Sequence, residues 1–223
     1  MAQKQGTKVI MPPPLTINYV AQARVFAREL IGRDFTDEEL AHAVGALDGA
    51  VLEVQKKQGA GELRIEISHP LMDEQKRWMR RDAQGDLLIF NYRFYKKKDT
   101  PSGASVDSLL RQVRGARALG VKRLETFGAG DFTTSQQPNG EIGYLLWAKF
   151  GFDAPLNKRY QNLANDEPSL SGANTLNDVI NTLAGEKWWH EVGSGLTMIF
   201  DLAPNSSSMM IFRSYLRRKG KIL

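Results

Sequence analysis

The sequence contains no cysteine, and this absence excludes disulfide bonds, thiolate nucleophiles and thiolate metal ligands. Histidine is scarce: only His42, His69 and His190 occur, and their separations match no metal-ligand spacing. No apolar run approaches the roughly 18 residues that a membrane-spanning helix needs, and the first residues lack the long apolar core of a secretory signal. We therefore expect a cytoplasmic protein with neither a metal site nor a membrane contact.

The chain of 223 residues is long enough for one domain that buries most of its apolar surface. Its 42% hydrophobic and 25% charged residues are typical of a folded globular protein. Residues 1–14 end in three prolines, which predict an extended N-terminal arm ahead of a single domain over residues 15–223. Within this domain we expect a core at residues 87–154 and a C-terminal extension at residues 155–223.

The first half of the domain combines helical and strand patterns. Apolar residues recur at helical spacing from Ile17 to Ile31, which predicts a helix that ends at Gly32. Thr36 and Glu39 have the spacing of a capping box and predict a second, short helix. Four later segments alternate apolar and polar residues and predict strands, namely residues 50–57, 62–68, 76–82 and 86–98.

Cations and aromatic residues interleave along the last two of these strands. The cations are Lys76, Arg77, Arg80, Arg81, Arg93, Lys96, Lys97 and Lys98, and the aromatic residues are Trp78, Phe90, Tyr92, Phe94 and Tyr95. A basic, aromatic sheet face can bind single-stranded nucleic acid, and the formal net charge of +5 is compatible with such a partner. The same alternation also arises in any mixed sheet that places aromatic residues in its core and cations in water, so both interpretations stay open.

The central segment, Leu87 to Asp153, organises the rest of the chain. After the strand at its start, it predicts a small-residue loop at residues 99–105, an amphipathic helix at residues 106–120 and a strand at residues 121–126. A short helix and a strand follow at residues 140–149 and 150–154. This succession indicates parallel strands joined by a crossover helix, and unpaired amides at the start of that helix suit a phosphate-bearing ligand. We expect an α/β (α+β) fold.

Two short motifs lie in this central segment. Residues 100–105 read Thr-Pro-Ser-Gly-Ala-Ser, and residues 146–152 read Leu-Trp-Ala-Lys-Phe-Gly-Phe. In this order and at this separation they resemble the GCN5-related N-acetyltransferase (GNAT) superfamily, which carries a Q/R-x-x-G-x-G/A loop and an L-Y-E-K-x-G-F segment. The matching residues are Gly103, Leu146, Lys149, Gly151 and Phe152. The sequence departs from the family at Thr100, Ser105 and Trp147, and Pro101 removes one loop amide.

The resemblance implies a mixed, mostly antiparallel central sheet flanked by helices. It also implies acetyl-CoA as co-substrate and transfer of its acetyl group to an amine whose identity the sequence does not reveal. The residues that it places at the co-substrate are Tyr95, Thr100, Gly103, Ala104, Ser105 and Trp147. A base must remove a proton from the amine, and the candidates for acid–base roles are Glu125, Glu141 and Tyr144. Where many family members have an acidic tyrosine, Trp147 has no hydroxyl to donate.

These departures leave a second function class open. A GNAT-like module could serve without catalysis as a structural or interaction component that recognises a protein partner. The N-terminal arm, the polar residues 156–173 and the basic C-terminal helix would then be contact surfaces. The basic charge also fits a nucleoprotein assembly.

Overall fold

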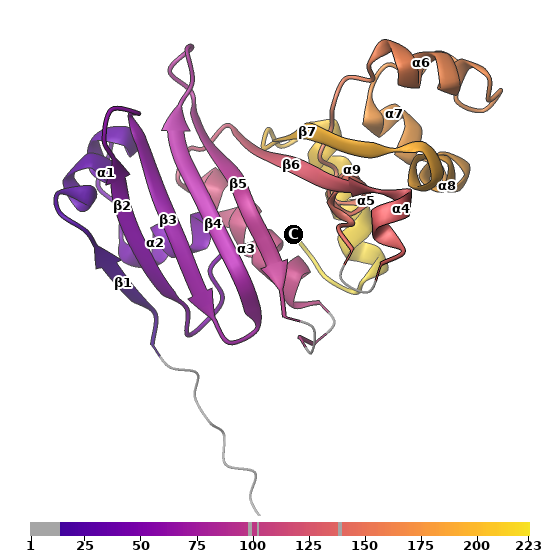
Figure 1. Ribbon diagram of the computed structural model, residues 1–223. Helices are drawn as coiled ribbons and strands as arrows, with labels where there is room; N and C mark the ends of the chain where they lie inside the picture. The colour runs from indigo at the N-terminus through magenta and orange to yellow at the C-terminus, as the bar shows by residue number, and fades with distance from the viewer. Residues whose placement is uncertain (1–13, 98–99, 102, 138–139) are drawn as a thin grey trace, which may run out of the picture.

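The computed structural model describes residues 14–97, 100–101, 103–137 and 140–223. They form a mixed α/β structure built on one seven-stranded sheet in which the strands follow one another in chain order (Figure 1). The arm predicted over residues 1–14 lies outside the described residues except for Pro14. In the part of the chain that the structure describes, no helix combines the length and apolarity required to cross a membrane.

The strands arise where apolar and polar residues alternate with a period of two, as the sequence predicts for most of them. Their bounds are β1 (Thr16–Tyr19), β2 (Val51–Lys57), β3 (Glu62–His69), β4 (Met72–Arg81), β5 (Leu87–Lys96), β6 (Arg123–Asp131) and β7 (Ser194–Asp201). Strands β1 and β2 run parallel, as do β5 and β6, and the other four neighbouring pairs are antiparallel. The sheet is therefore mixed and mostly antiparallel, as expected.

Most helices begin at a side chain that caps their free amides. Thr36 and Glu39 form the predicted capping box, and Ser206 accepts a hydrogen bond from the Met209 amide at the start of the last helix. The helices are α1 (Ala23–Ile31), α2 (Asp37–Ala43), α3 (Ala104–Ala118), α4 (Phe132–Ser135), α5 (Gly143–Lys149), α6 (Lys158–Asn165), α7 (Leu176–Ile180), α8 (Leu183–Val192) and α9 (Ser207–Arg218). Helix α3 connects the parallel strands β5 and β6.

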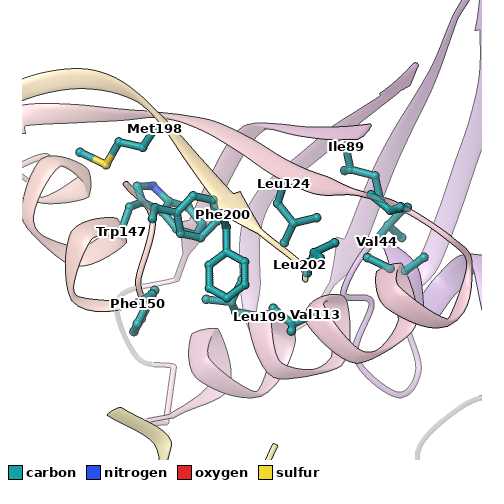
Figure 2. Packing of buried hydrophobic residues seen from close by; sticks show 14 of the residues in the cluster. Val44, Ile89, Leu109, Val113, Leu124, Trp147, Phe150, Met198, Phe200 and Leu202 are labelled. Carbon is teal, nitrogen blue, oxygen red and sulfur yellow. The ribbon is translucent and has the colours of Figure 1, made fainter. Parts of the chain in front are cut away.

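The two faces of the sheet differ in what covers them. Figure 1 shows α1, α2 and α3 behind strands β1–β5, so one face is packed and the other is open. Figure 2 shows Ile89 and Leu124 of the sheet facing Leu109 and Val113 of α3 within the buried core. Each fully buried aliphatic side chain of this kind contributes about 1.5–3 kcal/mol to folding. The opposite face is called the open face below.

Two segments differ from the sequence prediction. The helix predicted from Ile17 begins only at Ala23, because the preceding residues form β1 and pair their backbone with β2. The strand predicted over residues 150–154 is reduced to a single bridge between Asp153 and Ile199 of β7. In both places tertiary pairing, and not local spacing, determines the structure. Strand β7 itself comes from the C-terminal extension and completes the sheet beside β6.

Candidate functional site

Strands β5 and β6 pair over only part of their length. Their register runs from Leu88 opposite Arg123 to Asn91 opposite Thr126, whereas β5 continues to Lys96 and β6 to Asp131. Beyond the last pair the two strands diverge (Figure 1), while the other edge of β6 pairs with β7 from Arg123 to Asp131. We call this divergence the β5–β6 opening. The hydroxyl of Thr126 donates to the carbonyl oxygen of Asn91 at 3.2 Å and closes its narrow end.

A bulge in β5 lies at the start of this opening. The register between β4 and β5 shifts between Lys76 and Arg77, which face Arg93 and Asn91, so Tyr92 is an extra residue without a partner on β4. A bulge of this kind interrupts the ladder and re-aims the backbone and side chains. Tyr92 stacks on Trp78 of the open face, with ring centroids 4.2 Å apart. The bulge thus places irregular backbone where the sheet opens.

The loop before α3 presents an unobstructed helix start. Gly103 is the N-cap residue with φ of 105°, and no side chain of the described residues caps the helix. A Cβ at Gly103 would meet only Asp107 Oδ2, at 4.0 Å, so the position is open. Ala104 is buried and Ser105 is half-buried in the first turn. The Ala104 amide donates a long hydrogen bond to the carbonyl oxygen of Pro101 at 3.4 Å. The Ser105 amide has no acceptor among the described residues, as is usual in the first turn of a helix, and such a group can bind an anion.

Thr100, predicted to contact the co-substrate, makes hydrogen bonds within the protein. It is buried, its hydroxyl donates to the carbonyl oxygen of Leu71, and its amide donates to the carbonyl oxygen of Lys97. Thr100 therefore anchors the loop to the β3–β4 turn. It does not offer a free hydroxyl to a ligand.

Tyr95 and Glu141, predicted separately, come together at the wide end of the β5–β6 opening. The Tyr95 hydroxyl donates to Glu141 Oε1 at 3.1 Å. Partial burial, and then the hydrogen bond to Glu141, raise the pKa of Tyr95. The backbone of Glu141 also lies against Gly130 of β6, where a Cβ would stand 2.0 Å from its carbonyl oxygen. Glu141 thus contacts both diverging strands.

Trp147 of α5 is a core residue. Its exposed fraction is 6%, and its ring packs 4.9 Å from Phe152 and 5.3 Å from Phe94 of β5. Figure 2 shows it among the buried side chains near Met198 and Phe200. The indole therefore joins α5 to the far end of β5 from inside the opening.

Tyr144 is placed where it cannot act as a base at the opening. It is fully buried, its hydroxyl donates to the carbonyl oxygen of His190 at 2.9 Å, and its carbonyl oxygen accepts from Trp189 Nε1 at 3.0 Å. Burial raises the pKa of Tyr144. These contacts fasten α5 to α8 and hold the phenol in its neutral form.

Glu125 lies near the narrow end of the opening but belongs to the open face. Its carboxylate accepts from Arg123 Nε at 2.8 Å and from Arg80 Nη2 at 3.4 Å. Two guanidinium groups therefore occupy both of its oxygens. The three acid–base candidates do not converge, because Glu141 is at the wide end, Glu125 is on the open face and Tyr144 is buried against α8.

The open face carries three of the predicted aromatic residues, and many of its described cations are paired. Trp78, Phe90 and Tyr92 stack side by side across β4 and β5. The ion pairs are Arg64–Glu62, Lys76–Glu66, Lys76–Glu74, Arg80–Glu125, Arg93–Glu74, Arg123–Asp82 and Arg123–Glu125, all within 3.4 Å. Binding to a phosphate backbone depends on cations that can neutralise it. Ion pairing leaves fewer cations for such binding, and nucleic acid stays a prediction for this face.

Arg77 differs from the other cations of its strand. The sequence prediction grouped it with a basic face, but its side chain lies on the packed face of β4 and its exposed fraction is 0%. The signal that identifies it is its register: Arg77 is two residues before Met79, which is also fully buried. An alternating strand places both on the same face.

The C-terminal residues run beside α3. Lys221 Nζ forms an ion pair with Asp107 in the first turn of that helix, and Arg114 Nη2 donates to the carbonyl oxygen of Ile222 at 2.8 Å. Figure 1 shows the C-terminus next to α3. Lys221 thereby compensates a negative charge in the first turn of α3, close to the N-cap residue Gly103.

Comparisons with protein-family models, curated proteins and solved structures gave no match.

Proposed function

We propose that the chain is a GNAT-like acyltransferase that transfers an acetyl group from acetyl-CoA to an amine. The observation that carries the proposal is the divergence of β5 and β6 after Asn91 and Thr126, beside an uncapped α3. Such an arrangement offers strand amides on one side and helix amides on the other. Acetyl-CoA needs both, because its thioester carbonyl accepts from the strand amides and its pyrophosphate from the helix amides.

The residues of this chain divide the work as follows. The amides of Gly103, Ala104 and Ser105 hold the pyrophosphate, and Gly103 leaves the space that it needs. The exposed edge of β5 after the bulge at Tyr92 offers backbone donors to the thioester carbonyl. Acetyl-CoA supplies an activated acyl group for attack by an amine.

Among the acid–base candidates we assign proton removal to Glu141. It is exposed, it contacts both strands of the opening, and it holds the hydroxyl of Tyr95. Glu125 accepts hydrogen bonds from two arginines, and the Tyr144 hydroxyl donates a hydrogen bond to a backbone carbonyl oxygen. A carboxylate at the mouth can accept a proton from an incoming amine directly or through water.

A second candidate function is a GNAT-like binding module without catalysis. One observation favours it: the buried indole of Trp147 and the ring of Phe94 pack together beside the opening, at 5.3 Å. An indole cannot protonate a departing thiolate. In this case the fold serves a structural or interaction role for a protein partner.

The two candidates are separated by a melting-temperature titration with acetyl-CoA followed by a transfer assay with generic amines. A ligand that binds only the folded state stabilises it by about 2.7 kcal/mol at 100 times its Kd. The proposal predicts a saturable rise in Tm and measurable transfer. A rise without transfer supports the binding module, and an unchanged Tm at millimolar acetyl-CoA contradicts acyl-CoA binding.

The placement of the site is tested by Gly103→Glu, which introduces bulk and negative charge beside the helix amides. It should abolish the Tm response to acetyl-CoA. Gly172→Glu is the matched control, because Gly172 also has a positive φ, of 85°, and an added Cβ would meet nothing within 4 Å there, but it lies in the C-terminal extension. A Tm response that persists in Gly103→Glu would mean that the loop is not the binding site, and loss of the response in both variants would mean that the effect of Gly103→Glu is not specific to the loop.

A further inference from the structure

Arg77 is a buried cation without a counter-ion. Its side chain is fully buried between Ile65 of β3 and Asn91 of β5, its partners in the sheet register. Among the described residues no carboxylate lies within ion-pair distance of its guanidinium. Burial lowers the pKa of Arg77 to about 9, and the group still carries its charge at neutral pH. An isolated buried charge is costly unless a partner compensates it.

The hydrogen bonds of Arg77 leave one edge of the guanidinium free. Nη1 donates to the carbonyl oxygens of Arg93 at 2.7 Å and Lys76 at 3.1 Å. Nε and Nη2 are buried and have no acceptor in the described part of the chain. These two nitrogens donate side by side along one edge of the planar group, which is the geometry that receives the two oxygens of a carboxylate.

The polar side chains around Arg77 largely satisfy one another. Asn91 and Gln112 exchange two hydrogen bonds, at 3.2 and 2.8 Å, and Gln75 Nε2 donates to Ser108 Oγ at 3.2 Å. Only Gln75 Oε1 is also left without a donor among the described residues. The free edge of Arg77 is thus the one charged group of this cluster that still needs a partner.

Phe94 connects this cluster to the β5–β6 opening. Its ring lies 5.0 Å from the Arg77 guanidinium and 5.3 Å from the ring of Trp147. Phe94 is only partly buried, whereas Arg77 behind it is fully buried. The ring of Phe94 therefore contacts both the guanidinium and the indole of Trp147.

We propose that Arg77 binds the carboxylate of a small organic acid through Nε and Nη2, inside the sheet–α3 layer. A carboxylate matches the single charge of Arg77, whereas a phosphate dianion would bury an excess negative charge, because no second cation contacts this edge among the described residues. The proposal depends on the geometry of Arg77 alone. It stands whether or not the chain transfers acyl groups.

The test uses sodium acetate as the probe, with sodium chloride at equal ionic strength as the reference. Acetate should raise the Tm of the full chain in a saturable manner and shift the Nε–H signal of Arg77 in a spectrum of ¹⁵N-arginine-labelled protein. Assignment of that signal comes from its loss in Arg77→Met. In this variant the acetate-dependent rise in Tm should disappear.

Arg80→Met is the control on the same strand. Its loss leaves Glu125 paired with Arg123 and Glu62 paired with Arg64, and the acetate response should remain. The proposal also predicts that, without acetate, Arg77→Met melts at a higher temperature than the wild type, because an uncompensated charge is removed from the interior. If Arg77 only clamps the carbonyl oxygens of Lys76 and Arg93, the same variant melts lower.

Three outcomes would overturn the proposal. The first is a wild-type Tm and Nε–H signal that respond to acetate no more than to chloride. The second is a response to inorganic phosphate without one to acetate, which contradicts the carboxylate assignment. The third is an acetate response that persists in Arg77→Met. If Arg77→Met does not fold, Arg77→Lys, which keeps a cation but has no Nε–H group, provides the assignment, and the wild-type Nε–H titration then decides the question.

Discussion

The Tyr95 hydroxyl donates a hydrogen bond to Glu141 Oε1 at 3.1 Å and thereby joins the free end of β5 to the segment that precedes α5. The same glutamate lies against Gly130 at the end of β6. Glu141, in the segment before α5, therefore contacts β5 and β6 where they diverge. Glu141 is in this sense both the proposed base and a structural tie.

Glu141→Gln tests these two roles separately. Glutamine keeps an oxygen that can accept from Tyr95, but it cannot take up a proton from an amine. We expect the free energy of unfolding to change by less than about 1 kcal/mol. The kcat of acetyl transfer should fall by roughly 10²–10⁴-fold. An unchanged kcat would show that Glu141 is not the general base. Glu125→Gln would then be the next variant to measure.

The Tyr95–Glu141 contact should depend on pH in the alkaline range. Because partial burial and Glu141 raise the pKa of Tyr95 above its ordinary value of 10.0, the folded state disfavours the phenolate. The stabilisation is present below pH 10 and is lost as pH rises through the raised pKa. Wild type should exceed Tyr95→Phe in unfolding free energy by under about 1 kcal/mol at neutral pH, since Tyr95 is 39% exposed.

The measurement is urea unfolding of both proteins between pH 7 and pH 12. The difference should narrow only above pH 10. A difference that is constant over the whole range would show that the hydroxyl contributes no proton-linked stability.

Gly130→Ala should loosen the opening from the other side. Gly130 has φ of 98°, and an added Cβ would stand 2.0 Å from the carbonyl oxygen of Glu141. Strain in the backbone and forced displacement of Glu141 together should cost roughly 2–4 kcal/mol. In Gly172→Ala only the conformational cost applies, because its surroundings are open. Equal losses of stability in the two variants, measured by chemical denaturation, would contradict the close approach.

Tyr144→Phe separates structure from catalysis. Removal of the hydroxyl leaves the carbonyl oxygen of His190 without its donor, so stability should fall by about 1–2 kcal/mol. Because Tyr144 faces α8, the kcat of the folded variant should match the wild type. If kcat falls tenfold or more at a temperature at which the variant is fully folded, Tyr144 takes part in catalysis.

Trp147 gives a further contrast between the two proposed functions. Truncation to alanine should cost about 3–5 kcal/mol, because it removes a buried aromatic side chain that packs on Phe94 and Phe152. Trp147→Tyr retains most of that packing and adds a hydroxyl. If the opening is otherwise competent, this variant should equal or exceed the wild type in acetyl transfer. A folded Trp147→Tyr protein that binds acetyl-CoA but transfers nothing supports the binding module.

Much of the fold could be predicted because local signals and tertiary structure agree. The alternation in β2–β5, the amphipathic spacing of α3 and the capping box at Thr36 all predict elements that the structure contains. The helix predicted from Ile17 is wrong at its start, because the apolar spacing there fits both a helix and a strand. Backbone pairing with β2 determines that these residues form a strand. The strand predicted over residues 121–126 begins at Arg123 and continues as β6 to Asp131, because its pairing with β7 extends to Asp131 opposite Ser194.

The candidate site was less predictable for a physical reason. Tyr95 and Glu141 are separated by 46 positions, and only the divergence of two strands brings them together. Tyr144 and Trp147 both lie on α5 and are both buried. The spacing of apolar residues along this short helix does not show that Tyr144 contacts α8 and Trp147 contacts β5. The burial of Arg77 is the exception, because its strand register with Met79 contains that information.

The C-terminal segment contains cations without acidic residues of its own. Residues 207–223 hold five of the 30 lysines and arginines and none of the 25 acidic residues, so this segment accounts for the formal net charge of +5. Lys221 of this segment pairs with Asp107 at the start of α3, so part of its positive charge lies beside the loop of Gly103. A negatively charged ligand at this loop would therefore meet a region to which the C-terminal cations contribute.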